Sequence, residues 1–327
     1  MSLSFVPRAG LSNGHWMTLY SWGNPRQFPR LPEPTVRYFS PAPETQVLAH
    51  CHWHDDARSR LTLILLHGLN GSSDAHYMKG LADKAFARGM NVVRLNQRNC
   101  GNTEHLAPGL FHSGLTADAK HVIEELTTVD GIGRIAVAGY SLGGNLALRL
   151  AGEYGVEAPT QLVGVAAVSP ILEIGECVLA LERKSNWMYQ WNFVRGLKNR
   201  IRRKVALRPG SFDLDKLTMV RSVRDFDQLY TAPHFGFLDA TDYYHRASAM
   251  RVVDRITIPA LIITAEDDPF VPSAPFRHTA VTGNPHITLA ISAHGGHCGF
   301  IGPRNTPDHG YWAERTIVDF IGALPST

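Results

Sequence analysis

A short glycine–serine–glycine pattern places a serine where it could act as a nucleophile. Residues 139–143 read Gly-Tyr-Ser-Leu-Gly, after the apolar run 134–138 and before a segment with helical periodicity. A sharp turn from a strand into a helix leaves little room for Cβ atoms two residues either side of the serine, which explains Gly139 and Gly143. Such a turn exposes the Ser141 hydroxyl beside the unpaired amides of the helix N-terminus. The alternatives are a glycine-rich turn that closes an ordinary strand–helix junction and a phosphate-binding loop, but the Lys-Ser/Thr pair that a phosphate-binding loop needs does not follow.

A serine that attacks at neutral pH needs a base, and the base needs a carboxylate to orient it. Downstream segments supply both kinds of group, namely three consecutive acids, Glu266, Asp267 and Asp268, and two histidines either side of a glycine pair, His294 and His297. Each group follows a run that is expected to form a strand. The order serine, acid, histidine, with each member just past a strand, is one in which catalytic triads occur on parallel sheets.

A second glycine-containing loop follows the first apolar run, 61–66. Residues 67–71 read His-Gly-Leu-Asn-Gly. With Gly68 allowing close approach, the backbone N–H of Leu69 is expected to point at the same oxyanion as the N–H of Leu142. We expect His67 to be a structural packing or hydrogen-bonding residue and not a catalyst.

The elements that must position these residues alternate along the chain. Short apolar runs, expected to be strands, occupy 61–66, 91–95, 134–138, 162–168, 260–264 and 286–291. Amphipathic stretches, expected to be helices, occupy 78–86, 115–126, 142–154 and 317–324. This alternation predicts an α/β fold with a mostly parallel central sheet and helices on both of its faces.

Two segments depart from this alternation. Residues 171–255 contain few strand-like runs, so we expect a mostly helical cap inserted over the carboxyl ends of the strands. Residues 1–45 contain seven prolines and are expected to form an extended arm packed on the core. The core itself is then expected to comprise residues 46–170 and 256–327.

The composition excludes several classes of protein. The chain has 327 residues, of which 44% are hydrophobic, a net charge of +3 and four cysteines. It therefore has enough apolar side chain to fold, too little positive charge to suggest nucleic-acid binding, and no CxxC pair of a zinc ribbon. No apolar run approaches the roughly twenty residues of a membrane span, and no signal peptide is evident at the beginning, so we expect a cytoplasmic protein.

Three other features are ambiguous. His50, His52 and His54 alternate, but three ligands on one flat strand cannot close a tetrahedral metal site, so an exposed strand face is expected. The basic run 198–204 could attract anionic lipid or a charged thioester, although a solvated cap helix is the simpler interpretation. The aromatic residues of 187–193 could line an acyl pocket or pack the cap.

Taken together, these motifs resemble the α/β-hydrolase superfamily, and within it the YheT-like group of esterases with its embryogenesis-associated and yeast ester-synthase relatives. The matching segments are NGHWMTLY (13–20), HGLNGSS (67–73), NQRNCGNTEH (96–105), GYSLGGN (139–145), FDQLYTAPHFGFLDATDYY (226–244), TAEDDPFVP (264–272) and HGGHCGF (294–300). The resemblance implies the α/β-hydrolase fold, Ser141 as nucleophile, His297 as base and Asp268 as acid. Asp268 is preferred to Asp267, the alternative acid, because the family places its acid directly before a proline.

One position departs from the family pattern. The family has Arg-Gly after the fourth strand, where this sequence has Arg98-Asn99. We expect this departure to affect the shape of the loop only, because it lies outside the triad.

The function expected from these residues is hydrolysis of carboxylic esters with short- to medium-chain acyl groups, through an acyl-enzyme and without metal or organic cofactor. The expected substrate is a small-molecule or lipid-like ester, and no nucleic acid, integral membrane segment or particular oligomeric state is predicted. Transfer of the acyl group from a thioester to an alcohol is the alternative, since it would use the same triad. A non-catalytic binding protein is less expected because the triad is not degenerate.

Overall fold

The core of the protein is a single twisted sheet. The structure, a computed structural model, describes residues 3–306 and 309–325. The strands are β1 (Thr35–Ala42), β2 (Thr45–His52), β3 (Leu61–Leu66), β4 (Asn91–Leu95), β5 (Arg134–Tyr140), β6 (Leu162–Val168), β7 (Ala260–Ala265) and β8 (Ile287–Ser292). Within the described residues they pair in the order β1-β2-β4-β3-β5-β6-β7-β8. Pairing is antiparallel at β1·β2 and β2·β4 and parallel from β4 to β8, which confirms the predicted mostly parallel sheet.

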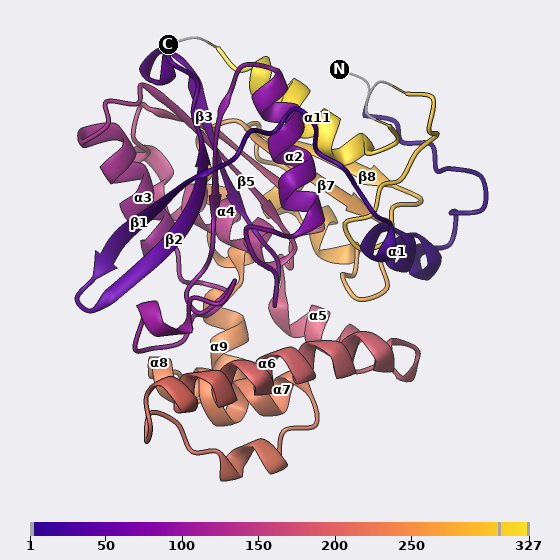
Figure 1. The fold of residues 1–327 in the computed structure, drawn as a ribbon. Helices are drawn as coiled ribbons and strands as arrows, with labels where there is room; N and C mark the ends of the chain where they lie inside the picture. Colours follow the sequence, from indigo (N-terminus) through magenta and orange to yellow (C-terminus); the bar gives the residue numbers. More distant parts are fainter. Residues whose placement is uncertain (1–2, 307–308, 326–327) are drawn as a thin grey trace.

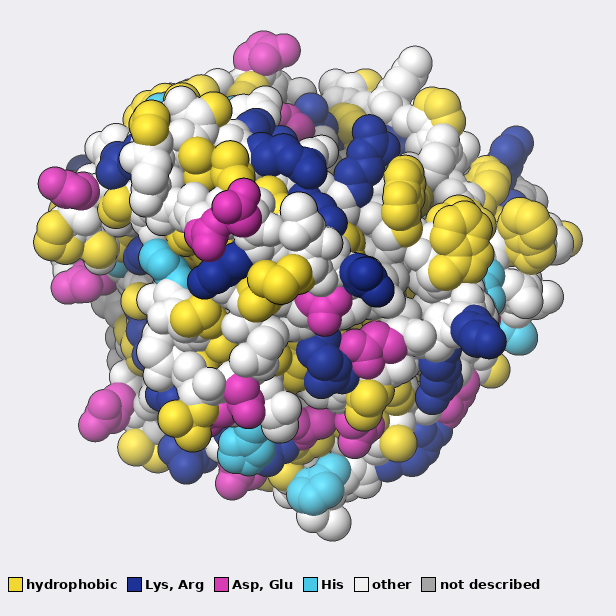
Figure 2. Space-filling view, turned by 90° about the horizontal axis from the view of Figure 1, so that it is seen from below, with side chains coloured by type: hydrophobic (Ala, Val, Ile, Leu, Met, Phe, Trp, Pro, Cys, Tyr) yellow, Lys and Arg dark blue, Asp and Glu magenta, His cyan; other side chains and the backbone are white. Residues whose placement is uncertain are grey.

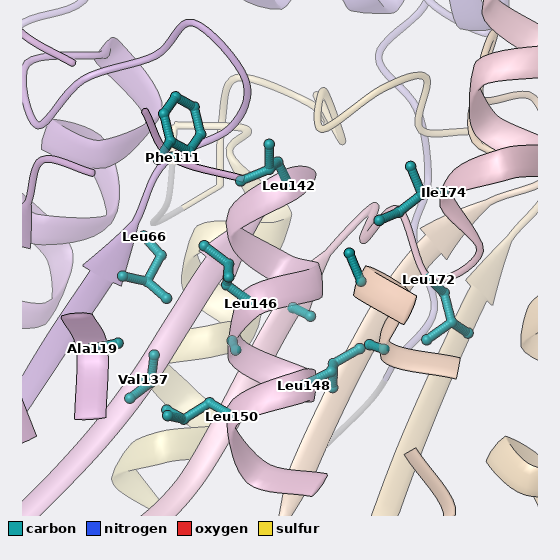
Figure 3. Packing of buried hydrophobic residues seen from close by; sticks show 14 of the residues in the cluster. Leu66, Phe111, Ala119, Val137, Leu142, Leu146, Leu148, Leu150, Leu172 and Ile174 are labelled. Carbon is teal, nitrogen blue, oxygen red and sulfur yellow. The ribbon is translucent and has the colours of Figure 1, made fainter. Parts of the chain in front are cut away.

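Helices cover both faces of this sheet (Figure 1). Those that pack on it are α2 (His76–Ala87), α3 (Ala117–Thr128), α4 (Leu142–Tyr154) and α11 (Trp312–Gly322). Successive side chains of a strand point to opposite faces, and β3 shows the result. Leu63 and Leu65 pack with α2 and α11, whereas Leu66 packs on the other side with Val137 and the leucines of α4 (Figure 3). Burial on both faces explains why β3 is an unbroken apolar run.

A helical block lies beyond the carboxyl ends of the strands, below the sheet in Figure 1. Its helices are α5 (Ile174–Leu181), α6 (Trp187–Leu207), α7 (Val223–Phe226), α8 (Ala232–Phe235) and α9 (Ala240–Ala247). The structure describes all of residues 171–255, and no strand occurs among them. The short helix α10 (Thr279–Thr282) then precedes β8. Among the described residues, no helix combines the length and the apolar character that crossing a membrane requires.

The first 45 residues differ from the extended arm that the sequence predicts. They contain the helix α1 (Gly14–Gly23) and the edge strand β1. The prolines flank α1 and do not interrupt it, and the side chain of Asn13 caps it by accepting from the N–H of Trp16. The segment does pack on the core, because Met17 is fully buried and Arg26 forms a buried ion pair of 2.6 Å with Glu314.

Candidate active site

Ser141 occupies a strained turn between β5 and α4. Its backbone has φ +55° and ψ −115°, a conformation that a residue with a side chain adopts only under constraint from its surroundings. A Cβ atom at Gly139 would lie 2.0 Å from the carbonyl oxygen of Gly143. A Cβ at Gly143 would lie 2.2 Å from the carbonyl oxygen of Leu66. The two glycines are therefore required by the close approach of backbone to backbone.

The loop after β3 lies directly against this turn. A Cβ at Gly68 would be 3.3 Å from the Cβ of Ser141. Among the described residues, the N–H groups of Leu69 and Leu142 have no hydrogen-bond partner. Two unpaired amides beside a serine hydroxyl are the donors that an oxyanion hole requires.

His67 supports this loop from within the core. It is fully buried, its Nδ1 lies 2.8 Å from the carbonyl oxygen of Gly68, and its Nε2 accepts from the N–H of Gln97. Burial lowers the pKa of His67 to about 4, so the ring is neutral at physiological pH. Both nitrogens are occupied by the backbone, which is the geometry of a structural residue.

Asp268 and His297 form a buried pair at the ends of β7 and β8. Oδ2 of Asp268 lies 2.9 Å from Nδ1 of His297, and the two side chains are 0% and 11% exposed. Oδ1 of Asp268 accepts from the backbone N–H groups of Phe270 and Val271. With Nδ1 donating to the carboxylate, Nε2 keeps its lone pair and can take a proton.

The charge state of His297 reflects opposing effects. Burial disfavours the imidazolium, but Cys298 and the Asp268 carboxylate outweigh it and raise the pKa of His297 above its ordinary value. A base with a raised pKa holds a proton more firmly once it has accepted one from a nucleophile.

The alternative acid, Asp267, points to a different partner. Its Oδ1 accepts from the N–H of Gly296, and its Oδ2 lies 3.4 Å from Nδ1 of His294. This pair is more exposed than the other, with side chains 20% and 40% accessible for Asp267 and His294. The fold thus brings Asp268, and not Asp267, to the imidazole of His297.

Ser141 and His297 line one cavity of ≈ 430 Å³, which we call the outer cavity. Within the described part of the chain no hydrogen bond joins their side chains. Such bonds are often long in a free enzyme and tighten when substrate binds. A hydroxyl that shares a cavity with an imidazole held by a buried carboxylate, and that has two free amides beside it, is suited to acyl transfer through a covalent intermediate.

A second, inner cavity of ≈ 90 Å³ begins at the same serine and extends under the cap. Its walls are mostly apolar, with Leu69 and Leu142 at the serine and Val178, Leu197 and Phe226 of the cap region above them. For the aromatic residues of 187–193, the sequence left open whether they line a pocket or pack the cap, and the structure places them differently from one another. Phe193 lines both cavities, whereas Trp187 and Trp191 are exposed.

Comparison with known proteins decides the family. A model of the alpha/beta hydrolase fold matches residues 62–302. The Escherichia coli protein YheT is 34% identical over 330 residues, which cover 98% of this chain and 93% of YheT. The chain belongs to the α/β-hydrolase family. Within that family it falls in the YheT-like group, as its motifs predict.

Other relatives of this α/β-hydrolase have names that describe activities. Phospholipase ABHD3 of Mus musculus is 30% identical, over 83% of this chain and 66% of its own length. Medium-chain fatty acid ethyl ester synthase/esterase 2 of Saccharomyces cerevisiae is 27% identical, over 79% of this chain and 61% of its own. The solved structure of the Pyrococcus furiosus esterase Pf2001 superposes with a TM-score of 0.60 at 16% identity, covering 93% of this chain and 98% of that one. At this identity the likeness shows the fold alone.

The departure from the α/β-hydrolase pattern at Asn99 has a structural reason. Asn99 has φ +62°, a left-handed conformation that glycine adopts freely and that asparagine tolerates better than most residues. Its Nδ2 donates to the carbonyl oxygen of Gly109, while Arg98 pairs with Asp118 at 2.6 Å. Asparagine is therefore compatible with the left-handed backbone at this position.

Sequence reasoning missed two residues that support the site. Thr18 of α1 accepts from the backbone N–H of His297 at 2.8 Å, and the hydroxyl of half-buried Tyr77 accepts from the N–H of Gly68 at 3.0 Å. The arm motif at 13–20 was a signal for Thr18, since it matches the family far from the triad. No pattern in the sequence singles out Tyr77.

The three alternating histidines form no metal site. The structure groups no three His, Cys, Asp or Glu side chains as metal ligands in the residues that it describes. The expected exposed strand face is wrong, however. His52 is buried beside Arg94, His50 lies 2.7 Å from the Ser73 hydroxyl, and the ring of His54 stacks on Phe86. These contacts come from β4, from α2 and from the loop after β3, which no local pattern indicates.

Proposed function

We propose that this protein hydrolyses carboxylic esters through a triad of Ser141, His297 and Asp268. The observation that carries the proposal is the strained serine between β5 and α4, which shares the outer cavity with an imidazole held by a buried carboxylate. The names of the yeast and mouse relatives, an ester synthase/esterase and a phospholipase, support an ester of a fatty acid as the bond attacked.

In the proposed first step, Oγ of Ser141 attacks the ester carbonyl carbon while Nε2 of His297 takes the hydroxyl proton. Asp268 stabilises the imidazolium that forms, and the N–H groups of Leu69 and Leu142 bind the oxyanion. His297 then protonates the leaving alcohol, and an acyl-enzyme remains on Ser141. Water attacks this acyl-enzyme with His297 again acting as base, and the carboxylic acid is released.

The two cavities suggest where each half of the substrate lies. The leaving alcohol must be close to His297, which lines the outer cavity and not the inner one. The acyl chain is therefore assigned to the inner cavity, whose walls are mostly apolar. Because that cavity is small and closed over by the cap, we propose short- to medium-chain acyl groups as the preferred substrates.

The proposal is tested by replacing Ser141 with alanine and measuring initial rates on 4-nitrophenyl esters from acetyl to palmitoyl. We expect the wild-type protein to prefer the shorter half of this series and Ser141→Ala to lose hydrolysis of every ester. Labelling by a fluorophosphonate probe should be lost in the same variant, while its thermal unfolding stays cooperative. Turnover by Ser141→Ala at the wild-type rate would refute the assignment.

Acyl transfer to an alcohol is the second candidate, because the name of the yeast relative includes both ester synthesis and hydrolysis. The same acyl-enzyme would then be attacked by an alcohol in the outer cavity instead of water. Supplying ethanol with a medium-chain thioester and measuring the ratio of ethyl ester to free acid distinguishes the two reactions.

The proposed location is the cytoplasm. Among the described residues all four cysteines are free thiols, at Cys51, Cys100, Cys177 and Cys298. Unpaired cysteines are usual in a reducing compartment.

A further inference from the structure

Large aromatic side chains are exposed around one side of the molecule. Of the six tryptophans in the chain, four are more than half exposed, and they come from two helices only. Trp16 and Trp22 belong to α1, and Trp187 and Trp191 belong to the beginning of α6. Exposing this much apolar surface is unfavourable in water, so a cluster of this kind marks a binding surface.

The helices α1 and α6 contact each other beside the outer cavity. The ring of His15 in α1 stacks on Tyr189 in α6 at 5.8 Å, and its Nδ1 lies 3.2 Å from the tyrosine hydroxyl. Trp22, Tyr189 and Phe193 line the outer cavity together with Ser141 and His297. Trp22 therefore lies at the outer cavity itself, and the other three exposed tryptophans belong to the two helices that contact each other beside it.

A row of basic side chains continues from the aromatic group along α6. Arg195, Lys198 and Arg202 follow Trp191 at spacings of three or four residues, which places them on one side of the helix. The guanidinium of Arg195 lies 5.4 Å from the ring of Trp191. None of the 21 residues of α6 is acidic, and within the described residues none of these three cations has a carboxylate partner. Figure 2, which views the cap from below, shows hydrophobic rings gathered at one side with lysine and arginine next to them.

We infer that this surface docks on a membrane that contains anionic phospholipid. We call it the α1–α6 surface and define it as Trp16, Trp22, Trp187, Met188, Trp191, Arg195, Lys198 and Arg202. Tryptophan is favoured at the level of lipid headgroups, and lysine and arginine are attracted to the negative surface of anionic membranes. Docking in this orientation brings the mouth of the outer cavity to the bilayer, so that an ester lipid can enter without crossing water.

The charge pattern favours a lipid surface over a second copy of the chain. A symmetric dimer through this surface would bring two rows of Arg195, Lys198 and Arg202 together, and no acidic residue of α6 is available to compensate them. A merely solvated face, the simpler interpretation of the basic run, would not need four exposed tryptophans beside it.

Binding is tested with Ser141→Ala, so that the outcome does not depend on hydrolysis. We expect this protein to sediment with vesicles of phosphatidylcholine and phosphatidylglycerol, to bind far less to pure phosphatidylcholine, and to be released by high salt. Its tryptophan fluorescence should shift to shorter wavelength on binding.

Two independent sets of substitutions locate the surface. Arg195→Glu, Lys198→Glu and Arg202→Glu together should lower the partition coefficient on anionic vesicles by about tenfold or more. Trp187→Ser with Trp191→Ser should lower it on the same vesicles and reduce the fluorescence shift, of which Trp16 and Trp22 would supply the remainder. The matched control combines Arg58→Glu, Arg88→Glu and Arg255→Glu, which makes the same change in net charge. These three arginines are exposed and precede β3, β4 and β7, at the edge of the sheet away from the cap. This control should bind like the parent.

A second measurement is the rate of ester hydrolysis, made with proteins that keep Ser141. On a soluble ester such as 4-nitrophenyl acetate, the α6 variants should keep the wild-type rate, whereas on an ester presented in anionic vesicles their rate should fall in parallel with binding. The inference is overturned if the parent does not bind anionic vesicles, if the control loses as much binding as the α6 variants, or if light scattering shows that the tryptophan pair holds a dimer in place of a membrane contact. Any of these results would leave the proposed hydrolysis standing.

Discussion

The sharpest test of the proposed triad is the replacement of Asp268 by asparagine. Oδ1 of Asp268 accepts two backbone N–H groups, from Phe270 and Val271, and Oδ2 faces Nδ1 of His297 at 2.9 Å. In Asp268→Asn the amide oxygen would take the place of Oδ1, because the amide nitrogen cannot accept from those two donors. The amide NH₂ would then face Nδ1 and force it to accept, which moves the imidazole proton to Nε2.

With its proton on Nε2, His297 cannot take the proton of Ser141. The same change of tautomer in a serine protease lowers kcat by about 10⁴-fold, which corresponds to about 5.5 kcal/mol. We expect a loss of this size in Asp268→Asn with little change in thermal stability, since both backbone hydrogen bonds survive. The assay is the initial rate on 4-nitrophenyl butyrate, with folding checked by circular dichroism.

Asp267→Asn is the matched control, because the neighbouring carboxylate contacts His294 and the N–H of Gly296 instead. Its amide oxygen can still accept from Gly296, so we expect activity within about tenfold of wild type. The reasoning is refuted if Asp268→Asn retains a tenth or so of the wild-type rate, or if Asp267→Asn is the more damaging change.

Three further outcomes follow from the site. Gly143→Ala should lower the free energy of unfolding by about 1–3 kcal/mol or more, measured by urea denaturation, because its Cβ would meet the backbone of Leu66; unchanged stability would contradict the packing. Since Cys298 and Asp268 raise the pKa of His297, the imidazole stays protonated to higher pH, so kcat/KM should rise with pH with a midpoint above about 6.5; a profile already flat at pH 6 would contradict this. Thr18→Val should lower kcat by about tenfold or more by leaving the N–H of His297 unpaired, whereas Thr18→Ser keeps the acceptor and should behave like wild type; equal losses in both variants would contradict a role for this hydrogen bond.

Much of the fold was predictable because its signals are local. The buried strands are recognisable as apolar runs, and the predicted helix over 142–154 agrees with α4. The need for glycine at 139 comes from contacts within the turn at Ser141 itself. The need for glycine at 143 comes from the backbone of Leu66 in the neighbouring strand. By contrast, neither α1 nor the burial of the histidines of β2 was predicted. Prolines nearby obscured the first, and contacts with β4, α2 and the loop after β3 produced the second.

The sequence by itself determined the types and order of the chemical groups: a serine between two glycines, acids after one strand and histidines after the next. The tertiary structure alone decided which of them meet. Asp267 and Asp268 are adjacent in the chain, yet they face different histidines because successive side chains leave the backbone in different directions. Thr18 contacts the backbone of His297 across 279 residues, and α1 meets α6 at the mouth of the outer cavity. Contacts of this kind depend on how the whole chain packs, and no local pattern of residues encodes them.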